Sequence, residues 1–273
     1  MKTIIVPADF SENSVNAAIY AARLAEQLDM HITLLHALPL PLSAGEAVFP
    51  PSSYEDDFQQ TDQLMKQLKV KLEGSSKAIV SYRIIMDSFL AEIERLNHRQ
   101  DIFAMIMGMS GSNGAEAFLF GSFSLMAATH FKYPLLVIPP DCTFNGIQKV
   151  GLACDMLNVS ETLPAKSIID FLEHFDARLH ILHVAKPEAQ ETAQIAVASR
   201  SIQNMLQSLT PEMHVAKHIT VKEGLEQFVQ LNGIDLLMVI PKERTFVERV
   251  FHKSITKNMV LHSRVPVMIL HKQ

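Results

Sequence analysis

The chain repeats one order of apolar segments twice, and this duplication constrains its fold more than any other feature. Residues 2–9 form a short apolar run that ends in Asp9, and residues 149–155 form a similar run that ends in Asp155. The remaining segments pair in the same order: 31–37 with 179–185, 79–85 with 214–220, 102–108 with 234–240, and 133–139 with 265–270. Unrelated domains would not share this order, so the sequence predicts two tandem copies of one domain.

Each half consists of alternating strands and amphipathic helices. Several strand segments are continuously apolar, as in strands buried on both faces, and the helical stretches have apolar residues at helical spacing. We therefore expect an α/β fold with two doubly wound domains, each a five-stranded parallel sheet flanked by helices. Ser11 and Ser160 are the predicted N-caps of the first helix in each half. Residues 39–57, which contain four prolines, are predicted to form a long irregular loop.

The boundary between the halves is expected near 139–146, a segment of turn-forming residues, which gives domains at 1–142 and 143–273. The last strands of the two halves, 135–138 and 265–270, are strongly apolar and are expected at sheet edges. Exposed edges pair readily. We therefore expect these two strands to pair within the chain, which would make the halves an intrachain pseudo-dimer.

Charge and composition argue against several classes of function. The net charge is −5 and no Lys/Arg cluster is present, so the chain lacks the electrostatic footprint of a nucleic-acid-binding protein. No apolar run reaches the length of about 18 residues that a membrane span needs, and the first apolar run is too short before Asp9 for a secretory signal. Two cysteines, Cys142 and Cys154, fit a reducing compartment better than a disulfide. We expect a cytoplasmic protein.

A glycine pattern follows the apolar run at 102–107. It reads Gly108, then Gly111, and after nine further residues Gly121-Ser122. Glycine lets the backbone approach a ligand closely, and free N–H groups at a helix start attract anions. The spacing indicates a phosphate-binding loop, although it matches neither the P-loop nor the dinucleotide-binding pattern. A glycine-rich turn without a ligand explains the same residues equally well.

The ends of other strands would complete a crevice around this loop. In a doubly wound sheet, ligands bind beyond the carboxyl ends of the strands, where the connections diverge to opposite faces. If the first and fourth strands are neighbours, Asp9 shares this crevice with the glycines, and Ala37 ends the second strand beside them. The Asp9 carboxylate could then accept hydrogen bonds from ribose hydroxyls, and the backbone at Ala37 could contact an adenine edge. The glycines and Ser122 would hold phosphates.

These features resemble the signatures of the universal stress protein family. The resemblance lies in Val-Pro-Ala-Asp at 6–9, Leu-Leu-His at 34–36, the glycine pattern, and Tyr-Pro-Leu-Leu-Val-Ile at 133–138. It covers both halves and implies the strand order 3-2-1-4-5, with ATP bound by members that keep the glycines. It also implies nucleotide contacts at Asp9, Ala37, Met107, Gly108, Gly111, Gly121, Ser122 and Phe123. Pro7 and Ala8, which precede Asp9 at the end of the first strand, are included in the predicted site. Met109 and Phe123 depart from the smaller residues usual in the family, which would narrow the pocket.

The second half lacks the glycine pattern. Counted back from Ser254, the positions of the three glycines hold Ile240, Glu243 and Lys253. Their side chains would keep phosphates away, and the Glu243 carboxylate would repel them. We therefore expect ATP, with or without Mg²⁺, in the first half only.

We find no catalytic set and no metal-ligand pattern. Hydrolysis needs a placed water, a base and usually a metal held by carboxylates, and the glycine pattern contains no lysine. The 12 histidines show no metal-binding spacing. Repetition of the fold explains His36 and His183, which end matching strands. The remaining histidines that we considered are expected at exposed helix or loop positions: His174, His180, His252 and His262.

The hypothesis that follows is a non-catalytic stress-response protein that binds an adenine nucleotide. ATP would bias the loops around the crevice and so change the affinity for an unknown protein partner. Further association into a homodimer is compatible with the apolar edges. Two alternatives stay open: a nucleotide-free scaffold protein that binds other proteins, and a slow nucleotide hydrolase.

Overall fold

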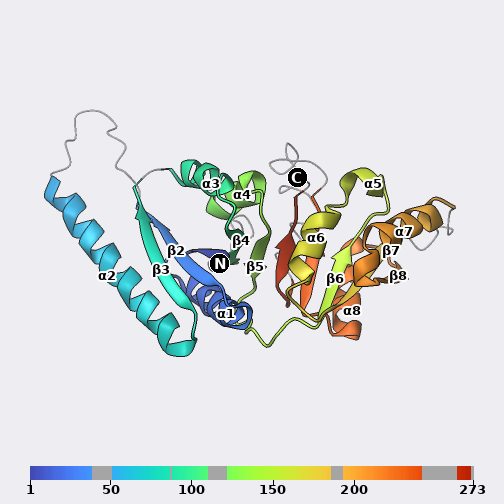
Figure 1. Ribbon diagram of the computed structural model, residues 1–273, viewed down its shortest axis with the longest axis horizontal. Helices are drawn as coiled ribbons and strands as arrows, with labels where there is room; N and C mark the ends of the chain where they lie inside the picture. Colours follow the sequence, from blue (N-terminus) through green and yellow to red (C-terminus); the bar gives the residue numbers. More distant parts are fainter. Residues whose placement is uncertain (39–50, 87, 110–121, 186–192, 242–262, 272–273) are drawn as a thin grey trace. The chain divides into compact units, whose positions relative to one another are not determined.

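The computed structural model of the chain has two compact units, Met1–Tyr133 and Pro134–Gln273 (Figure 1). It describes residues 1–38, 51–86, 88–109, 122–185, 193–241 and 263–271. Among the helices that it describes, none is both long enough and apolar enough to cross a membrane. The boundary between residues 142 and 143 stays a prediction.

The first unit contains a parallel sheet in which the strands pair in the order β3-β2-β1-β4. Along the chain, β2 and β3 are added on one side of β1, whereas β4 lies on its other side. Right-handed connections therefore place α1 and α2 on one face of the sheet and α3 and α4 on the other. The packing of α1 against α2 and of α3 against α4 agrees with this assignment. The described elements are β1 (Thr3–Pro7), α1 (Glu12–Leu28), β2 (His31–Ala37), α2 (Pro51–Ser75), β3 (Ile79–Ile85), α3 (Phe89–Asn97), β4 (Ile102–Gly108) and α4 (Ser122–His130).

The second unit has a mixed sheet in the order β5-β10-β9-β6-β7-β8, in which β5 and β10 are antiparallel. The other described pairs are parallel. Its elements are β5 (Leu135–Ile138), β6 (Lys149–Ala153), α5 (Val159–Thr162), α6 (Ala165–Leu172), β7 (Arg178–Ala185), α7 (Ala193–Met205), a 3-10 turn (Gln207–Leu209), β8 (Glu212–Lys217), α8 (Val221–Asn232), β9 (Leu236–Val239) and β10 (Val267–Ile269).

The predicted strand order is confirmed in both halves of the sequence. The first half follows β3-β2-β1-β4-β5 and the second half β8-β7-β6-β9-β10, which is 3-2-1-4-5 in each. The pairing of the two apolar last strands is also confirmed, because β5 and β10 pair antiparallel with Leu136 opposite Met268. The arrangement of the halves as a pseudo-dimer stays a prediction.

The sequence explains why the first elements form where they do. Every residue of β1 is buried, because this strand lies between β2 and β4 and has helices over both faces. Helix α1 begins at Glu12 because Ser11 caps it, with its hydroxyl accepting a hydrogen bond from the Ser14 amide at 3.2 Å. The N-cap prediction for Ser11 is therefore confirmed. Alanines such as Ala17 and Ala21, which are fully buried, let the helix lie close to the sheet.

Three local predictions are wrong. Ser160 lies inside α5 and is not an N-cap, because this helix already starts at Val159 with Asn158 in the cap position, and α6 follows as a separate helix after Pro164. Residues 51–57 belong to α2 and not to a loop, and this helix starts at Pro51, since proline suits the first helical position. The rest of the predicted loop lies outside the described residues. Strand β8 ends at Lys217, earlier than predicted, because Thr220 caps α8 and accepts a hydrogen bond from the Glu223 amide.

The prediction that His180 is exposed is also wrong. His180 belongs to β7 and is only 6% exposed, because β7 is an interior strand of the second sheet and Phe228 of α8 covers this face. His174 is exposed, as predicted, whereas His252 and His262 lie outside the described residues. Cys142 and Cys154 are both half-buried, and neither forms a disulfide bond within the described residues.

Candidate functional site

The turn between β1 and α1 carries the first candidate residue, Asp9. Its Oδ1 atom accepts two hydrogen bonds from Ser11, one from the hydroxyl at 2.6 Å and one from the amide at 3.0 Å. The Asp9 amide lies 3.4 Å from the Ser14 hydroxyl. Burial raises the pKa of the Asp9 carboxyl, but these hydrogen bonds outweigh burial and bring the pKa below its ordinary value. The site therefore holds an ionised carboxylate at the start of α1 at neutral pH.

The same turn is tied to the end of β2 by His36. The His36 Nδ1 atom lies 2.7 Å from the Ala8 carbonyl oxygen, and the Ala8 amide donates to the Leu35 carbonyl at 2.8 Å. Phe10 stacks on the His36 ring with a centroid distance of 4.8 Å. Phe10 has φ = 64°, a left-handed conformation that non-glycine residues seldom adopt. These contacts hold Asp9 between the carboxyl ends of β1 and β2.

Gly108, at the end of β4, has a packing role that the sequence did not reveal. A Cβ atom added at Gly108 would lie 2.3 Å from the carbonyl oxygen of Asn13 and 3.0 Å from the Ser14 amide nitrogen. Both atoms belong to the backbone in the first turn of α1, so neither can rotate away. Glycine is therefore required here for the contact between strand and helix, independently of any ligand.

A cavity of about 150 Å³ lies at the carboxyl ends of β1, β2 and β4. Six of the residues that the sequence predicted for the site line it: Pro7, Ala8, Asp9, Ala37, Met107 and Gly108. Five lining residues were not among the predicted contacts: Ser11, Asn13, Ser14, His36 and Ser124. The rule that helix N-termini point at strand-end ligands would have found Ser11, Asn13 and Ser14, because they follow Asp9 closely at the start of α1.

The remaining predicted contacts lie in or near the glycine loop. Gly111 and Gly121 fall outside the described residues. The backbone of α4 begins at Ser122, and nothing is described of the side chains of Ser122 and Phe123. Ser124 lies in the same helix, is buried and faces the cavity.

The second half repeats the turn around Asp9. The His183 Nδ1 atom lies 3.0 Å from the Cys154 carbonyl oxygen, and the Cys154 amide donates to the Leu182 carbonyl at 2.9 Å. Asp155 Oδ1 accepts a hydrogen bond from the Leu157 amide, and Met156 has φ = 60°, like Phe10. The turn therefore belongs to the duplicated fold. The prediction that repetition explains His36 and His183 fits this geometry.

The halves differ at the end of the fourth strand. Ile240, half-buried, follows β9 at the position that corresponds to Gly108. The positions that correspond to the other glycines, Glu243 and Lys253, lie outside the described residues, as does Ser254.

Comparison with known proteins identifies the family. The model of the universal stress protein family matches the chain twice, over residues 1–139 and 146–271. The chain belongs to the universal stress protein family. A search of curated proteins finds no match.

Solved structures resemble this universal stress protein in fold. A universal stress protein from Archaeoglobus fulgidus DSM 4304 is 18% identical, with a TM-score of 0.73 over 99% of this chain and 96% of its own. A functionally unknown protein from Pseudomonas aeruginosa PAO1 is 15% identical, with a TM-score of 0.60 over 100% of this chain and 93% of its own. A further universal stress protein, solved in complex with cAMP, is 16% identical and matches 51% of this chain and 98% of its own, with a TM-score of 0.41.

Proposed function

We propose that this universal stress protein is a regulatory protein that binds an adenine nucleotide, ATP, in its first half only. The observation that carries the proposal is the cavity at the carboxyl ends of β1, β2 and β4, which is lined by six residues predicted from the sequence. In doubly wound folds, ligands bind at this edge of the sheet, where the connections diverge.

The chemistry of the lining supports a nucleoside. Asp9 is an ionised carboxylate that can accept hydrogen bonds from ribose hydroxyls. Ala37 ends β2 beside it, so its backbone can contact an adenine edge. Phosphates, with or without Mg²⁺, would extend towards the glycine pattern and the start of α4. Known small-molecule sites occupy roughly 300–1,000 Å³, so the nucleotide would need more space than the described cavity of about 150 Å³ provides.

The lining supports binding better than turnover. Its described residues include one carboxylate, Asp9, and no lysine or arginine. Phosphoryl transfer relies on cations and a positioned base around the phosphates. We therefore propose that ATP acts as a ligand that changes the affinity for a protein partner. In the second half, the sequence places Ile240, Glu243 and Lys253 where glycines would be needed, which is why we assign the nucleotide to the first half.

The duplicated turn provides a matched pair of variants for the test. Asp9→Asn keeps an acceptor for Ser11 but removes the charge, and Asp155→Asn makes the same change in the second half. In ATP titrations of the full chain we expect one site in the wild type. Asp9→Asn should weaken binding by about 10- to 100-fold, which corresponds to the loss of a hydrogen bond to a charged group. Asp155→Asn should have little effect on ATP binding.

Three outcomes would contradict this proposal. Absence of saturable binding by the wild type at millimolar ATP would favour the nucleotide-free scaffold. A loss that follows Asp155→Asn and not Asp9→Asn would move the site to the second half. Release of phosphate that increases with protein concentration and disappears in Asp9→Asn would favour a hydrolase. Circular dichroism of both variants checks that the fold is retained.

A further inference from the structure

Two histidines and a glutamate meet on neighbouring strands of the second unit, away from its strand-end crevice. His180 lies in the first half of β7, and Glu212, its register partner, is the first residue of β8. His214 lies two residues after Glu212, so its side chain is on the same face of the sheet. The group is therefore near the amino ends of these parallel strands. His183, which belongs to the crevice turn, lies nearer the carboxyl end of β7.

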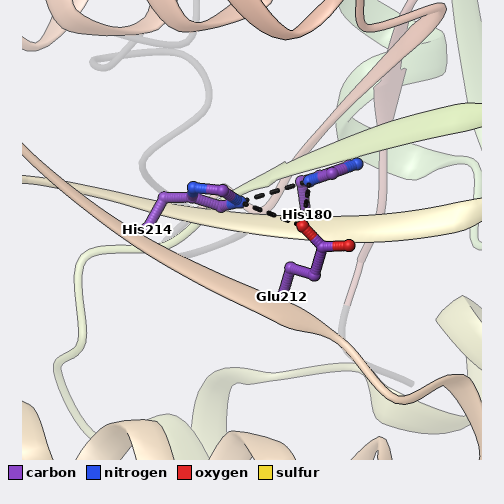
Figure 2. A group of neighbouring side chains, drawn as sticks. All are labelled: His180, Glu212 and His214. Carbon is purple, nitrogen blue, oxygen red and sulfur yellow. Dashed lines mark hydrogen bonds and ion pairs between the residues drawn. The ribbon is translucent and has the colours of Figure 1, made fainter.

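The donor atoms of these side chains converge (Figure 2). His180 Nδ1 is 3.2 Å from His214 Nε2 and 3.4 Å from Glu212 Oε2, and the last two atoms are 3.9 Å apart. A point equidistant from the three atoms lies about 2.0 Å from each, the length of a bond from Zn²⁺ to a histidine nitrogen or a carboxylate oxygen. A cation can therefore be held without rearrangement of the strands.

The surroundings of the group favour a partly enclosed site. The His180 side chain is 8% exposed, while Phe228 of α8 packs against both imidazole rings at centroid distances of 5.0 Å to His214 and 6.4 Å to His180. Glu212 and His214 remain 53% and 30% exposed, so one side is open to solvent. Burial lowers the pKa of His180, and the positive charges of Lys149 and Arg178 lower it further, whereas the Glu212 carboxylate opposes this effect.

The two ring nitrogens of buried His180 lie in different surroundings. Its Nε2 atom is buried and has no hydrogen-bond partner among the described residues. Its Nδ1 atom contacts His214 and Glu212 and is therefore the ring nitrogen that can bind a cation.

We propose that His180, Glu212 and His214 form a three-ligand site for a divalent cation of the Zn²⁺ type, with a fourth position open to solvent. Two imidazoles and one carboxylate are a donor set that suits Zn²⁺, and an open position is typical of sites that bind a further ligand. The cation would link β7 to β8 and present a Lewis acid at the surface of the second unit. Because His180 Nε2 has no partner among the residues that the structure describes, the affinity should be about 10- to 100-fold below that of a fully supported site.

The test uses the untagged 273-residue chain and ZnCl₂ in isothermal titration calorimetry. The two ligands that are not buried are changed in Glu212→Gln and His214→Gln, since replacement of buried His180 could prevent folding. His174→Gln, which changes an exposed histidine of the same unit, is the control. We expect one Zn²⁺ per chain in the wild type and the control, and affinity reduced more than about tenfold in both ligand variants.

Visible absorption of bound Co²⁺ gives a second readout, because its bands report the coordination geometry. The bands of a four-coordinate ion should appear in the wild type and be lost in both ligand variants. Equal affinity in all four proteins would mean that other histidines bind the ion, and this would overturn the proposal. Failure of the wild type to bind Zn²⁺ would overturn it too. Neither result depends on whether the first half binds ATP.

Discussion

Asp101 joins the starts of two strands in the first unit. Its carboxylate accepts hydrogen bonds from Arg99 Nε at 2.9 Å and Arg99 Nη2 at 2.5 Å, and from the Thr3 hydroxyl at 3.2 Å. Its carbonyl oxygen accepts from the Thr3 amide at 2.7 Å. The hydrogen bonds from Arg99, which exceed the opposing effect of burial, lower the pKa of Asp101 to about 2.

This shift predicts how stability depends on pH. The folded pKa lies below the ordinary value of 3.8, so the interaction stabilises the fold fully above about pH 4, and the contribution is lost as pH falls towards about 2. Asp101→Asn should lower the free energy of unfolding at pH 7. The difference from the wild type should shrink between about pH 4 and pH 2. Urea unfolding at several pH values measures this difference in the free energy of unfolding. A difference that does not change with pH would contradict the lowered pKa of Asp101.

At the scale of elements, the first turn of α1 packs closely against the end of β4. This contact is possible because Gly108 has no side chain. Local sequence signals predicted both elements and the cap at Ser11, because capping involves residues only three apart. They did not predict the contact between Gly108 and Asn13, which is made across 95 residues of chain. The sequence therefore allowed Gly108 to be interpreted as part of a phosphate-binding loop or of a turn without a ligand, but not as a packing residue of α1.

Two glycine substitutions separate packing from helix propensity. Gly108→Ala should destabilise the protein by about 1–3 kcal/mol, because its Cβ would overlap the Asn13 backbone. Gly74→Ala, within α2 and with nothing within 4 Å of the added atom, should stabilise it by about 0.5–1 kcal/mol. Thermal and urea unfolding compare the two variants. A neutral Gly108→Ala would show that α1 can move away at little cost.

At the scale of the whole molecule, the strand β5 groups with the second unit although it ends the first half of the sequence. Leu136 of β5 is fully buried, and it lies opposite Met268, which is also fully buried. Side chains in such positions contribute strongly to stability because their removal leaves a cavity.

Leu136→Ala should cost about 2–5 kcal/mol in the second unit. In hydrogen exchange measured by mass spectrometry, amides of β9 and β10 should exchange faster, while those of β2 and β3 should change little. Val197→Ala on α7, where the side chain is 66% exposed, is the control and should stay within about 0.5 kcal/mol of the wild type. Equally faster exchange in β2 and β3 would show that the units do not unfold separately.

The duplicated pattern of apolar segments was sufficient to predict two α/β halves, because these depend on local periodicity. The strand order and the six predicted residues that line the cavity came with the resemblance to the universal stress protein family. Three features required the folded chain: the packing role of Gly108, the membership of β5 in the second unit, and the meeting of His180 with Glu212 and His214. Each of these features depends on contacts between segments that are far apart in sequence. Side-chain contacts of this kind depend on the register between strands and on the approach of helices, which packing of the complete chain sets and no local spacing encodes.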